Sequence, residues 1–288
     1  KTPAVEAAGE SPEQPEKVQA SHILIKTGDV RPVPEAEKVI ESLKKQDERS
    51  FVQKFVMDQI KSAKIEAMAA RLKREFPEVP LVTTLKDNTY SLQTCLKSID
   101  VFVPVTGNFI YTNAVAARAS GKKVGWYVCG GGDSPRPEFF FGRDAIEPRM
   151  LTSALAAKFD PEWFLYYATA GWSTVEPITS GPFTKWSPEG WHDYMGDGNI
   201  LACGPGGMPL STLRLENFRD GLEDYAYALE LERRLQAGQS ASWSALAREL
   251  LAVPKDVMVS MTEYTYDPAK LYAWRNEIAD LIEESDAK

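Results

Sequence analysis

Between residues 52 and about 168, short apolar runs alternate with amphipathic stretches, and this alternation constrains the fold most strongly. The runs FVQKFVM, VPLVTT, VFVPVT, KKVGWYVC and EWFLYYAT have the length and composition of buried strands. Strands that alternate with helices indicate parallel βαβ units. We therefore predict an α/β fold of about five parallel strands, either an α/β barrel or a doubly wound sheet, and five strands are too few to close a barrel.

The helical stretches between these runs share an amphipathic pattern. They are KSAKIEAMAARLKREF, which stops at Pro77, then SLQTCLKSI, TNAVAARASG and EPRMLTSALAAKF. The C-terminal part is predicted to form a helical cap, with helices at about 212–237, 241–252 and 268–285. A long irregular segment rich in Gly, Pro and Trp follows Trp172. Long loops in compact domains are usually functional, so we expect this one to cover a site; a plain surface loop is the alternative.

Composition limits the classes of function. The net charge of −8 argues against nucleic acid as a partner, and no apolar run is long enough to span a bilayer. Cys95, Cys129 and Cys203 are widely spaced and fit neither a disulfide framework nor a zinc site. The chain has only two histidines, His22 and His192, which leaves little material for a metal centre. We therefore expect no metal and no cofactor.

The first residues suggest a leader. Residues 1–17 are rich in Pro, Glu, Ala and Gly, a composition that predicts disorder. The chain starts at Lys1 and carries no recognisable signal peptide, so either a targeting segment has been removed or the chain is a fragment. A secreted or periplasmic bacterial protein is the expectation.

The stretch RLENFRDGLEDYAY, residues 214–227, concentrates acidic and basic side chains. On a helix, Phe218, Leu222, Tyr225 and Leu229 form one apolar stripe. Arg219 and Glu223 are spaced as an ion pair, and Ser211 is placed to cap the helix start. Gly221 in the helix interior suggests close approach of another backbone. We interpret the acidic residues as structural rather than catalytic.

The segment GDGNILACGPGGMPLSTLRLENFRDGLEDYAYALEL resembles the C-terminal part of glycoside hydrolase family 123 and the related bacterial domain of unknown function 4091. Upstream, GKKVGWYVC, FLYYATAGW and GPFTKW are similar to the barrel strands and aromatic loop of the family. The resemblance covers about residues 52–285. It implies a β-N-acetylgalactosaminidase-type enzyme with a glycan or glycoconjugate substrate, and it favours the barrel, so that the predicted fold is a partial (β/α) TIM-type barrel of about five parallel strands with a helical C-terminal cap.

The resemblance also implies a mechanism. In the family the 2-acetamido oxygen of the substrate attacks the anomeric carbon, an Asp orients the acetamido group, and an adjacent Glu is the acid/base. The matching positions here are Asp58 and Gln59 in VMDQ. Gln cannot transfer a proton, so the general-acid contribution, typically 10²–10⁴-fold, is expected to be lost. Without the resemblance, the same residues read as a strand end, with Asp58 capping the next helix.

Aromatic residues near the predicted strand ends are candidates for stacking on a sugar. They are Trp126, Tyr127, Tyr166, Tyr167, Trp172 and Trp186. Trp and Tyr combine an apolar ring with a polar group, which suits sugar binding, although the same residues are common in half-buried cores.

A second, shorter resemblance lies in VQASHILIKT…EAEKVIESLKK, which is similar to the start of a parvulin-type peptidyl-prolyl isomerase. His22 matches the active-site histidine of that family, and residues 18–51 would form a truncated strand and helix. The rest of the parvulin sheet is missing, so we expect no isomerase activity. Three functions remain open: a glycosidase, an isomerase acting through His22, and a non-catalytic glycan-binding protein.

Overall fold

The computed structural model describes residues 50–130, 135–139, 142–172, 176–179 and 195–286, with side chains described from residue 59 onward. The predicted leader and the parvulin-like strand and helix, including His22, lie outside the described residues. The chain divides into two compact units, one with residues up to 81 together with 91–99, the other with residues 82–90 and 100–288.

The first unit contains one long helix, α3, Ser50–Glu75. The prediction of a strand in FVQKFVM was wrong, because this run continues into the predicted helix without any Gly or Pro to separate them. A short apolar run alone cannot distinguish a strand from a helix. The helix predicted for residues 91–99 is also absent, and that segment consists of turns and bends. Its Ser98 donates hydrogen bonds from its backbone nitrogen and its hydroxyl to Glu66 on α3, at 3.0 and 2.7 Å.

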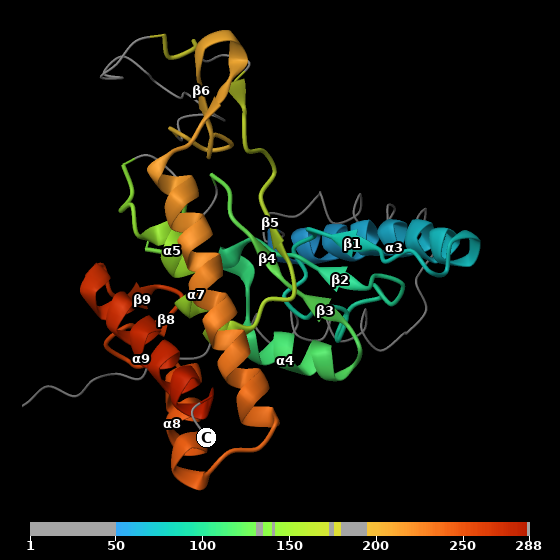
Figure 1. Ribbon diagram of the computed structural model, residues 1–288. Helices are drawn as coiled ribbons and strands as arrows, with labels where there is room; N and C mark the ends of the chain where they lie inside the picture. Colours follow the sequence, from blue (N-terminus) through green and yellow to red (C-terminus); the bar gives the residue numbers. More distant parts are fainter. Residues whose placement is uncertain (1–49, 131–134, 140–141, 173–175, 180–194, 287–288) are drawn as a thin grey trace, which may run out of the picture. The chain divides into compact units, whose positions relative to one another are not determined.

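The second unit contains a small parallel sheet (Figure 1). Its strands are β1 Val82–Thr83, β2 Val101–Phe102, β3 Lys123–Val124, β4 Trp126–Tyr127 and β5 Phe164–Leu165. Strand β2 pairs with β1 and β3, and β4 pairs with β5, all in parallel. Gly125 donates to the carbonyl of Phe102, and Val105 bridges Tyr127, so residues 123–127 act as one strand between β2 and β5. Four of the predicted strand regions are therefore confirmed, and the described residues form no closed barrel.

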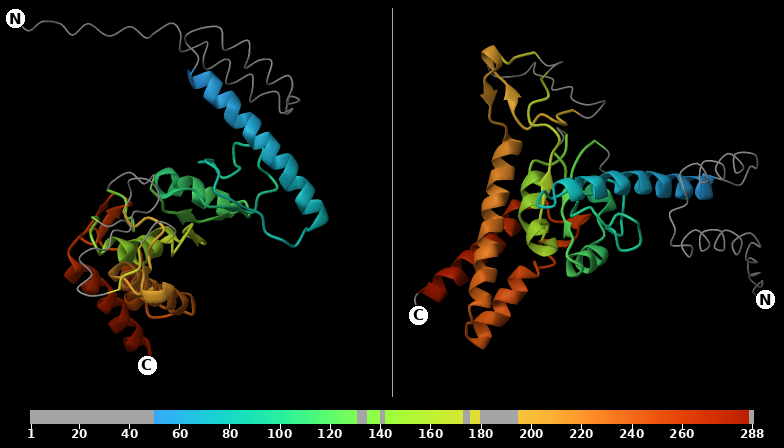
Figure 2. Two further views of the ribbon diagram at one scale, coloured as in Figure 1. Left: turned by 90° about the horizontal axis from the view of Figure 1, so that it is seen from above. Right: turned by 90° about the vertical axis from the view of Figure 1, so that its right-hand side faces the viewer.

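Helices pack beside this sheet. They are α4 Tyr111–Ala119, α5 Glu147–Thr152, α6 Ala154–Phe159, α7 Leu213–Gln236, α8 Ala241–Leu251 and α9 Pro268–Asp286. The single helix predicted over EPRMLTSALAAKF is broken at Ser153, whose ψ of −94° is not helical. The three predicted C-terminal helices are confirmed as α7, α8 and α9, and α7 runs beside α5 and α9 (Figures 1 and 2). Short 3-10 turns occupy Thr106–Asn108 and Pro205–Gly207. Strand β6, Ala202–Cys203, pairs in antiparallel fashion with β7, Pro209–Leu210. Strand β8, Met258–Ser260, pairs in the same way with β9, Glu263–Tyr264.

The core of the second unit lies between the sheet and the C-terminal helices. Trp126, Leu155, Leu231 and Trp274 are all buried within it. The indole of Trp274 donates to the carbonyl of Leu250 at 2.9 Å, so α9 is joined to α8 by a directed bond as well as by apolar contact. Buried tryptophans usually satisfy their N–H in this way.

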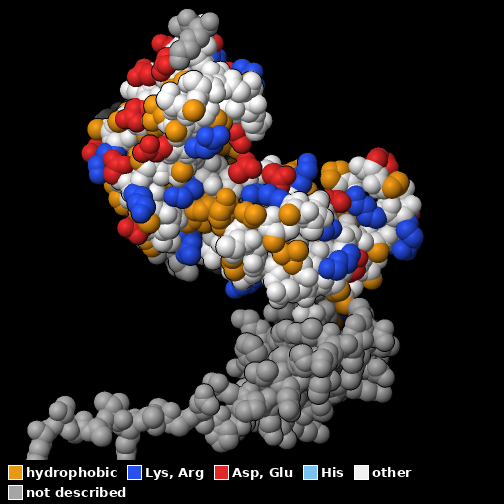
Figure 3. Space-filling model, turned by 90° about the horizontal axis from the view of Figure 1, so that it is seen from below, with side chains coloured by type: hydrophobic (Ala, Val, Ile, Leu, Met, Phe, Trp, Pro, Cys, Tyr) orange, Lys and Arg blue, Asp and Glu red, His pale blue; other side chains and the backbone are white. Residues whose placement is uncertain are grey.

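In Figure 3, acidic and basic side chains are interspersed with apolar ones across the visible described surface. No described helix is long and apolar enough to cross a membrane. The three cysteines form no disulfide in the described part of the chain, and no cluster of His, Cys, Asp and Glu there could hold a metal ion.

Candidate functional site

The loops that follow the parallel strands bring polar side chains to one edge of the sheet. Thr106 follows β2, Tyr127 ends β4, and Tyr166 and Tyr167 follow β5 directly. In α/β folds, ligands bind beyond the carboxyl ends of the strands, where these loops meet. We call the described residues of the loops after β2, β4 and β5, with the turn Gly196–Asn199, the carboxyl edge.

The carboxylate of Asp197 is the centre of a buried network. Asp197 accepts hydrogen bonds from the backbone of Gly130, at 2.8 Å, and from the hydroxyl of Tyr166, at 2.9 Å. The Tyr166 hydroxyl in turn accepts from the backbone of Gly198 at 2.7 Å. These bonds join the loops after β4 and β5 to the turn at 196–199. Burial raises the pKa of Asp197 above its ordinary value, although the three groups around it lower the pKa in part.

A second carboxyl, Glu138, is fully buried at 0% exposure. Burial, together with the neighbouring charge of Asp197, raises its pKa to about 8, so Glu138 is mostly protonated at neutral pH. Its backbone nitrogen donates to Glu147, which is held by Arg143 at 3.0 Å. A protonated carboxyl can donate a hydrogen bond as well as accept one. The carboxyl edge therefore holds a protonated carboxyl, Glu138, near the hydrogen-bonded carboxylate of Asp197.

The predicted aromatic residues fall into two groups. Trp126 is 1% exposed and packs edge-on against Phe109 with ring centroids 5.1 Å apart, so its indole lies in the core. Tyr166 packs against Phe139, and its pKa is raised mainly by burial. Trp172 is half-buried, with its indole donating to the carbonyl of Leu201 at 3.0 Å. Trp186 lies outside the described residues.

Tyr167 is the most exposed of these aromatic residues in the described part of the chain. Tyr167 is 50% exposed, and burial of its hydroxyl end raises its pKa to about 12. Tyr127 is half-buried. A side chain added at Gly198 would lie 2.7 Å from the Tyr167 hydroxyl, so the turn at 196–199 packs closely against this ring. Tyr167 therefore connects the buried network to solvent.

Asp58 and Gln59 lie within α3, not at the end of a strand, which corrects the predicted setting of both residues. Gln59 is half-buried. Their roles in catalysis stay a prediction that rests on the match to VMDQ.

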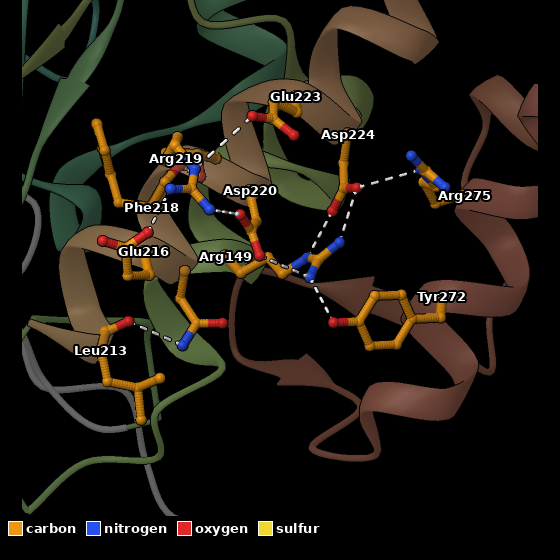
Figure 4. Close-up of polar contacts among 12 residues, drawn as sticks. Arg149, Leu213, Glu216, Phe218, Arg219, Asp220, Glu223, Asp224, Tyr272 and Arg275 are labelled. Atoms are coloured by element: carbon orange, nitrogen blue, oxygen red, sulfur yellow. Dashed lines mark hydrogen bonds and ion pairs between the residues drawn. The ribbon is translucent and has the colours of Figure 1, made fainter.

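The charged helix is structural where it is buried (Figure 4). Arg149 on α5 reaches Asp224 on α7 with a nitrogen–oxygen distance of 2.7 Å, and Tyr272 on α9 contacts the same guanidinium at 2.9 Å. The ion pair between Arg219 and Glu223 is confirmed at 3.7 Å and is exposed. These contacts join three helices and reach no part of the carboxyl edge.

Two details of that helix differ from the sequence prediction. Thr212, not Ser211, caps it, since its hydroxyl accepts from the backbone of Leu215 at 3.2 Å. The buried face also differs from the predicted apolar stripe, since Leu222 and Leu229 are 46% and 45% exposed. The buried residues are Gly221, Asp224, Ala228 and Leu231. The prediction considered only apolar residues, so it missed a buried face that includes a glycine and an ion-paired aspartate.

Sequence reasoning named neither Glu138 nor Asn199 as site residues, and it mentioned Asp197 only within a family motif. The signal for Asp197 was available, because an acid between Gly196 and Gly198 marks a tight turn with a fixed side chain. Glu138 follows Pro137 and precedes three phenylalanines, and an acid in such an apolar setting invites attention.

The open parallel sheet, with tyrosines and carboxyl groups beyond its strand ends, defines an α/β protein, a class in which ligands commonly bind at this edge. More particularly, the chain belongs to glycoside hydrolase family 123, because residues 37–230 match the family model described as "Glycoside hydrolase 123, catalytic domain". No curated protein matches the chain.

One solved structure similar to the chain is that of a family 123 glycoside hydrolase from Clostridium perfringens, described in terms of glycolipid glycan hydrolysis. The two are 18% identical, with a TM-score of 0.47, and the match covers 71% of this chain and 35% of that one. The chain thus spans about a third of the length of that protein.

Proposed function

We propose that the chain forms part of a glycoside hydrolase that acts on, or binds, terminal N-acetylgalactosaminides. The observation that carries this proposal is the family match, which includes both VMDQ and the carboxyl edge. The chemistry of the edge is compatible with it, because Asp197 and the protonated Glu138 offer acceptors and donors beside the exposed ring of Tyr167.

In this proposal, Asp58 orients the acetamido group of the substrate, whose oxygen attacks the anomeric carbon. The leaving oxygen then needs a proton, and Gln59 cannot supply one. A substrate with a good leaving group needs little protonation. The chain should therefore turn over a nitrophenyl glycoside slowly and a natural glycan hardly at all.

The test measures nitrophenol release from nitrophenyl N-acetyl-β-galactosaminide, and N-acetylgalactosamine release from a natural glycan, by the parent chain, Gln59→Glu and Asp58→Asn. Circular dichroism and a cooperative melt establish first that each variant folds. We expect Gln59→Glu to raise the rate, on the order of 10²-fold or more for a natural glycan, and Asp58→Asn to abolish it. No gain from folded Gln59→Glu on either substrate would overturn the assignment of the acid/base position.

The presence of Gln at position 59 also favours a second function, a non-catalytic glycan-binding protein. Such a protein needs the sugar site without the proton donor. Calorimetric titration with N-acetylgalactosamine would then show binding while no variant at position 59 gains activity. Absence of heat at millimolar sugar would exclude this function, since weak sugar sites have dissociation constants near that range.

A further inference from the structure

Helix α7 carries apolar side chains on a face that its contacts with the other helices do not bury. Its buried residues are Gly221, Asp224, Ala228 and Leu231. On another face Leu222 and Leu229 are 46% and 45% exposed, and Ala226 between them is also exposed. These three residues follow one another at i, i+4 and i+7, which places them on one side of the helix. We call Leu222, Ala226 and Leu229 the outer stripe.

The outer stripe differs from ordinary scattered surface leucines. A single exposed apolar side chain is common in proteins and needs no explanation. Here two leucines lie about two turns apart on a straight stretch of helix, with a small side chain between them. This is the arrangement by which one helix packs along another, because the leucines fill the gaps beside the small residue.

An ion pair lies at each end of the outer stripe. Glu216 pairs with Arg219 at the N-terminal end, and Glu230 pairs with Arg233 at the C-terminal end, at 2.7 Å. In both pairs the acid precedes the arginine by three residues, and the pairs are separated by about four turns. Arg219 also reaches Glu223 at 3.7 Å, so the acid nearest the middle of the stripe is paired as well (Figure 4).

The order of these charges determines which partner the stripe fits. When a second copy of α7 packs antiparallel across the outer stripe, Glu216 of each copy lies opposite Arg233 of the other. Arg219 of each copy then lies opposite Glu230 of the other. A parallel copy would instead place each arginine opposite the same arginine, and juxtaposed like charges are repulsive. The charges are therefore complementary to the same helix in the antiparallel direction.

We propose that the outer stripe of α7 is an interaction surface for a second copy of this chain, which docks antiparallel to form a two-fold symmetric dimer. Such an interface is self-complementary, because each copy contributes the same patch. Leu222 and Leu229 form its apolar centre, and Ala226 lets the two helices approach closely. A contact made by one helix face is small, so the dimer is a weak one that dissociates on dilution.

The first experiment is sedimentation velocity of the whole chain from about 1 µM to about 1 mM. It compares the parent with Leu222→Glu and Leu229→Glu, each of which places a charge in the apolar centre. Leu246→Glu is the matched control, because Leu246 is a leucine on α8 with a similar exposure of 44%. Circular dichroism and thermal melts establish that each variant folds, and if only one of the two stripe variants folds, that variant decides.

We expect the parent to shift from monomer to dimer as its concentration rises. Each stripe variant should weaken dimerisation at least about tenfold, because a buried unpaired charge is costly, while Leu246→Glu should behave as the parent. A parent that stays monomeric throughout would overturn the proposal. A dimer that persists in the stripe variants, or that Leu246→Glu weakens equally, would overturn it too, because the interface would then lie elsewhere.

The second experiment tests the antiparallel direction by exchanging charges. Arg233→Glu places an acid opposite Glu216 of the second copy, and Glu216→Arg places two arginines opposite each other. Each variant alone should dimerise roughly fivefold to tenfold more weakly than the parent. An equimolar mixture of the two restores opposite charges at both ends, so it should dimerise as strongly as the parent. A mixture that associates no better than the separate variants would overturn the antiparallel arrangement.

Discussion

At the scale of single residues, the molecule uses its buried charges in two different ways. Arg149 and Asp224 pair with each other and serve stability, whereas Glu138 is buried and forms no ion pair among the described residues. Burial of a polar or charged group costs free energy in both cases. For Arg149 and Asp224 the ion pair between them offsets part of this cost, whereas Glu138 has no such ion pair among the described residues. That contrast separates the structural acids of α7 from the acids of the carboxyl edge.

The raised pKa of Glu138 predicts that stability falls with rising pH. The folded chain holds this proton up to a pKa of about 8, while the unfolded chain releases it near 4.5. The folded state therefore binds more protons between these values, and the free energy of unfolding decreases as pH rises from 4.5 to 8. Each pKa unit corresponds to about 1.4 kcal/mol, so the loss is on the order of a few kcal/mol.

Urea unfolding of the parent chain and Glu138→Gln at pH 5, 6.5 and 8 measures this effect. Asp197 and Glu147 also have raised pKa values and give slopes of the same sign, so the difference between parent and variant isolates Glu138. The variant should show the flatter dependence. Parallel curves for the two proteins would mean that Glu138 titrates near its ordinary pKa.

The ion pair between Arg149 and Asp224 predicts a large loss of stability on substitution. Arg149→Met leaves Asp224 buried, and breaking a buried pair costs about 3–5 kcal/mol. Arg275 lies 3.8 Å from Asp224 and retains part of the compensation, so we expect the lower end of this range. Urea unfolding measures it, with Glu223→Gln as the exposed control, for which at most about 0.5 kcal/mol is expected. Equal losses of stability in Arg149→Met and Glu223→Gln would show that the buried pair stabilises the protein no more than the exposed pair does.

At the scale of elements, the packing of α5 against α7 depends on Gly221. A side chain there would lie 2.1 Å from the Thr152 hydroxyl and 2.7 Å from the carbonyl of Arg149. Backbone cannot move aside cheaply, so the glycine permits the approach that brings Arg149 to Asp224. The expectation of a close backbone approach at Gly221 is confirmed.

Gly221→Ala should therefore destabilise the protein even though alanine favours helix by about 1 kcal/mol. Overpacking typically costs about 1–3 kcal/mol, and here it also displaces the buried ion pair. A thermal melt compares it with Glu223→Ala on the exposed face of the same helix. A melting temperature for Gly221→Ala at or above that of the parent would show that α5 and α7 can move slightly apart at little cost in free energy.

Elements with strong local signals were predictable, and those that depend on context were not. The helices α7, α8 and α9 follow from long periodic stretches, and four strand regions follow from apolar runs bounded by Gly or Pro. The run at 51–57 could not be assigned, because no breaker separates it from the helix that absorbs it. The sequence predicted the carboxyl edge through Tyr166 and Tyr167. It could not predict Glu138 and Asn199, because their burial as polar groups is visible only in the three-dimensional structure.

At the scale of the whole molecule, the chain carries a family 123 catalytic domain match over residues 37–230 and spans 35% of the length of the similar solved structure. Its four parallel strand regions remain open in the described residues. The central claim is that this open sheet still forms a sugar site at its carboxyl edge.

A crystal structure of the chain soaked with N-acetylgalactosamine tests that claim most directly. The account predicts one sugar at the carboxyl edge, with its ring beside the exposed Tyr167. Sugar found instead against α7, α8 or α9, with no ligand at the carboxyl edge, would contradict it.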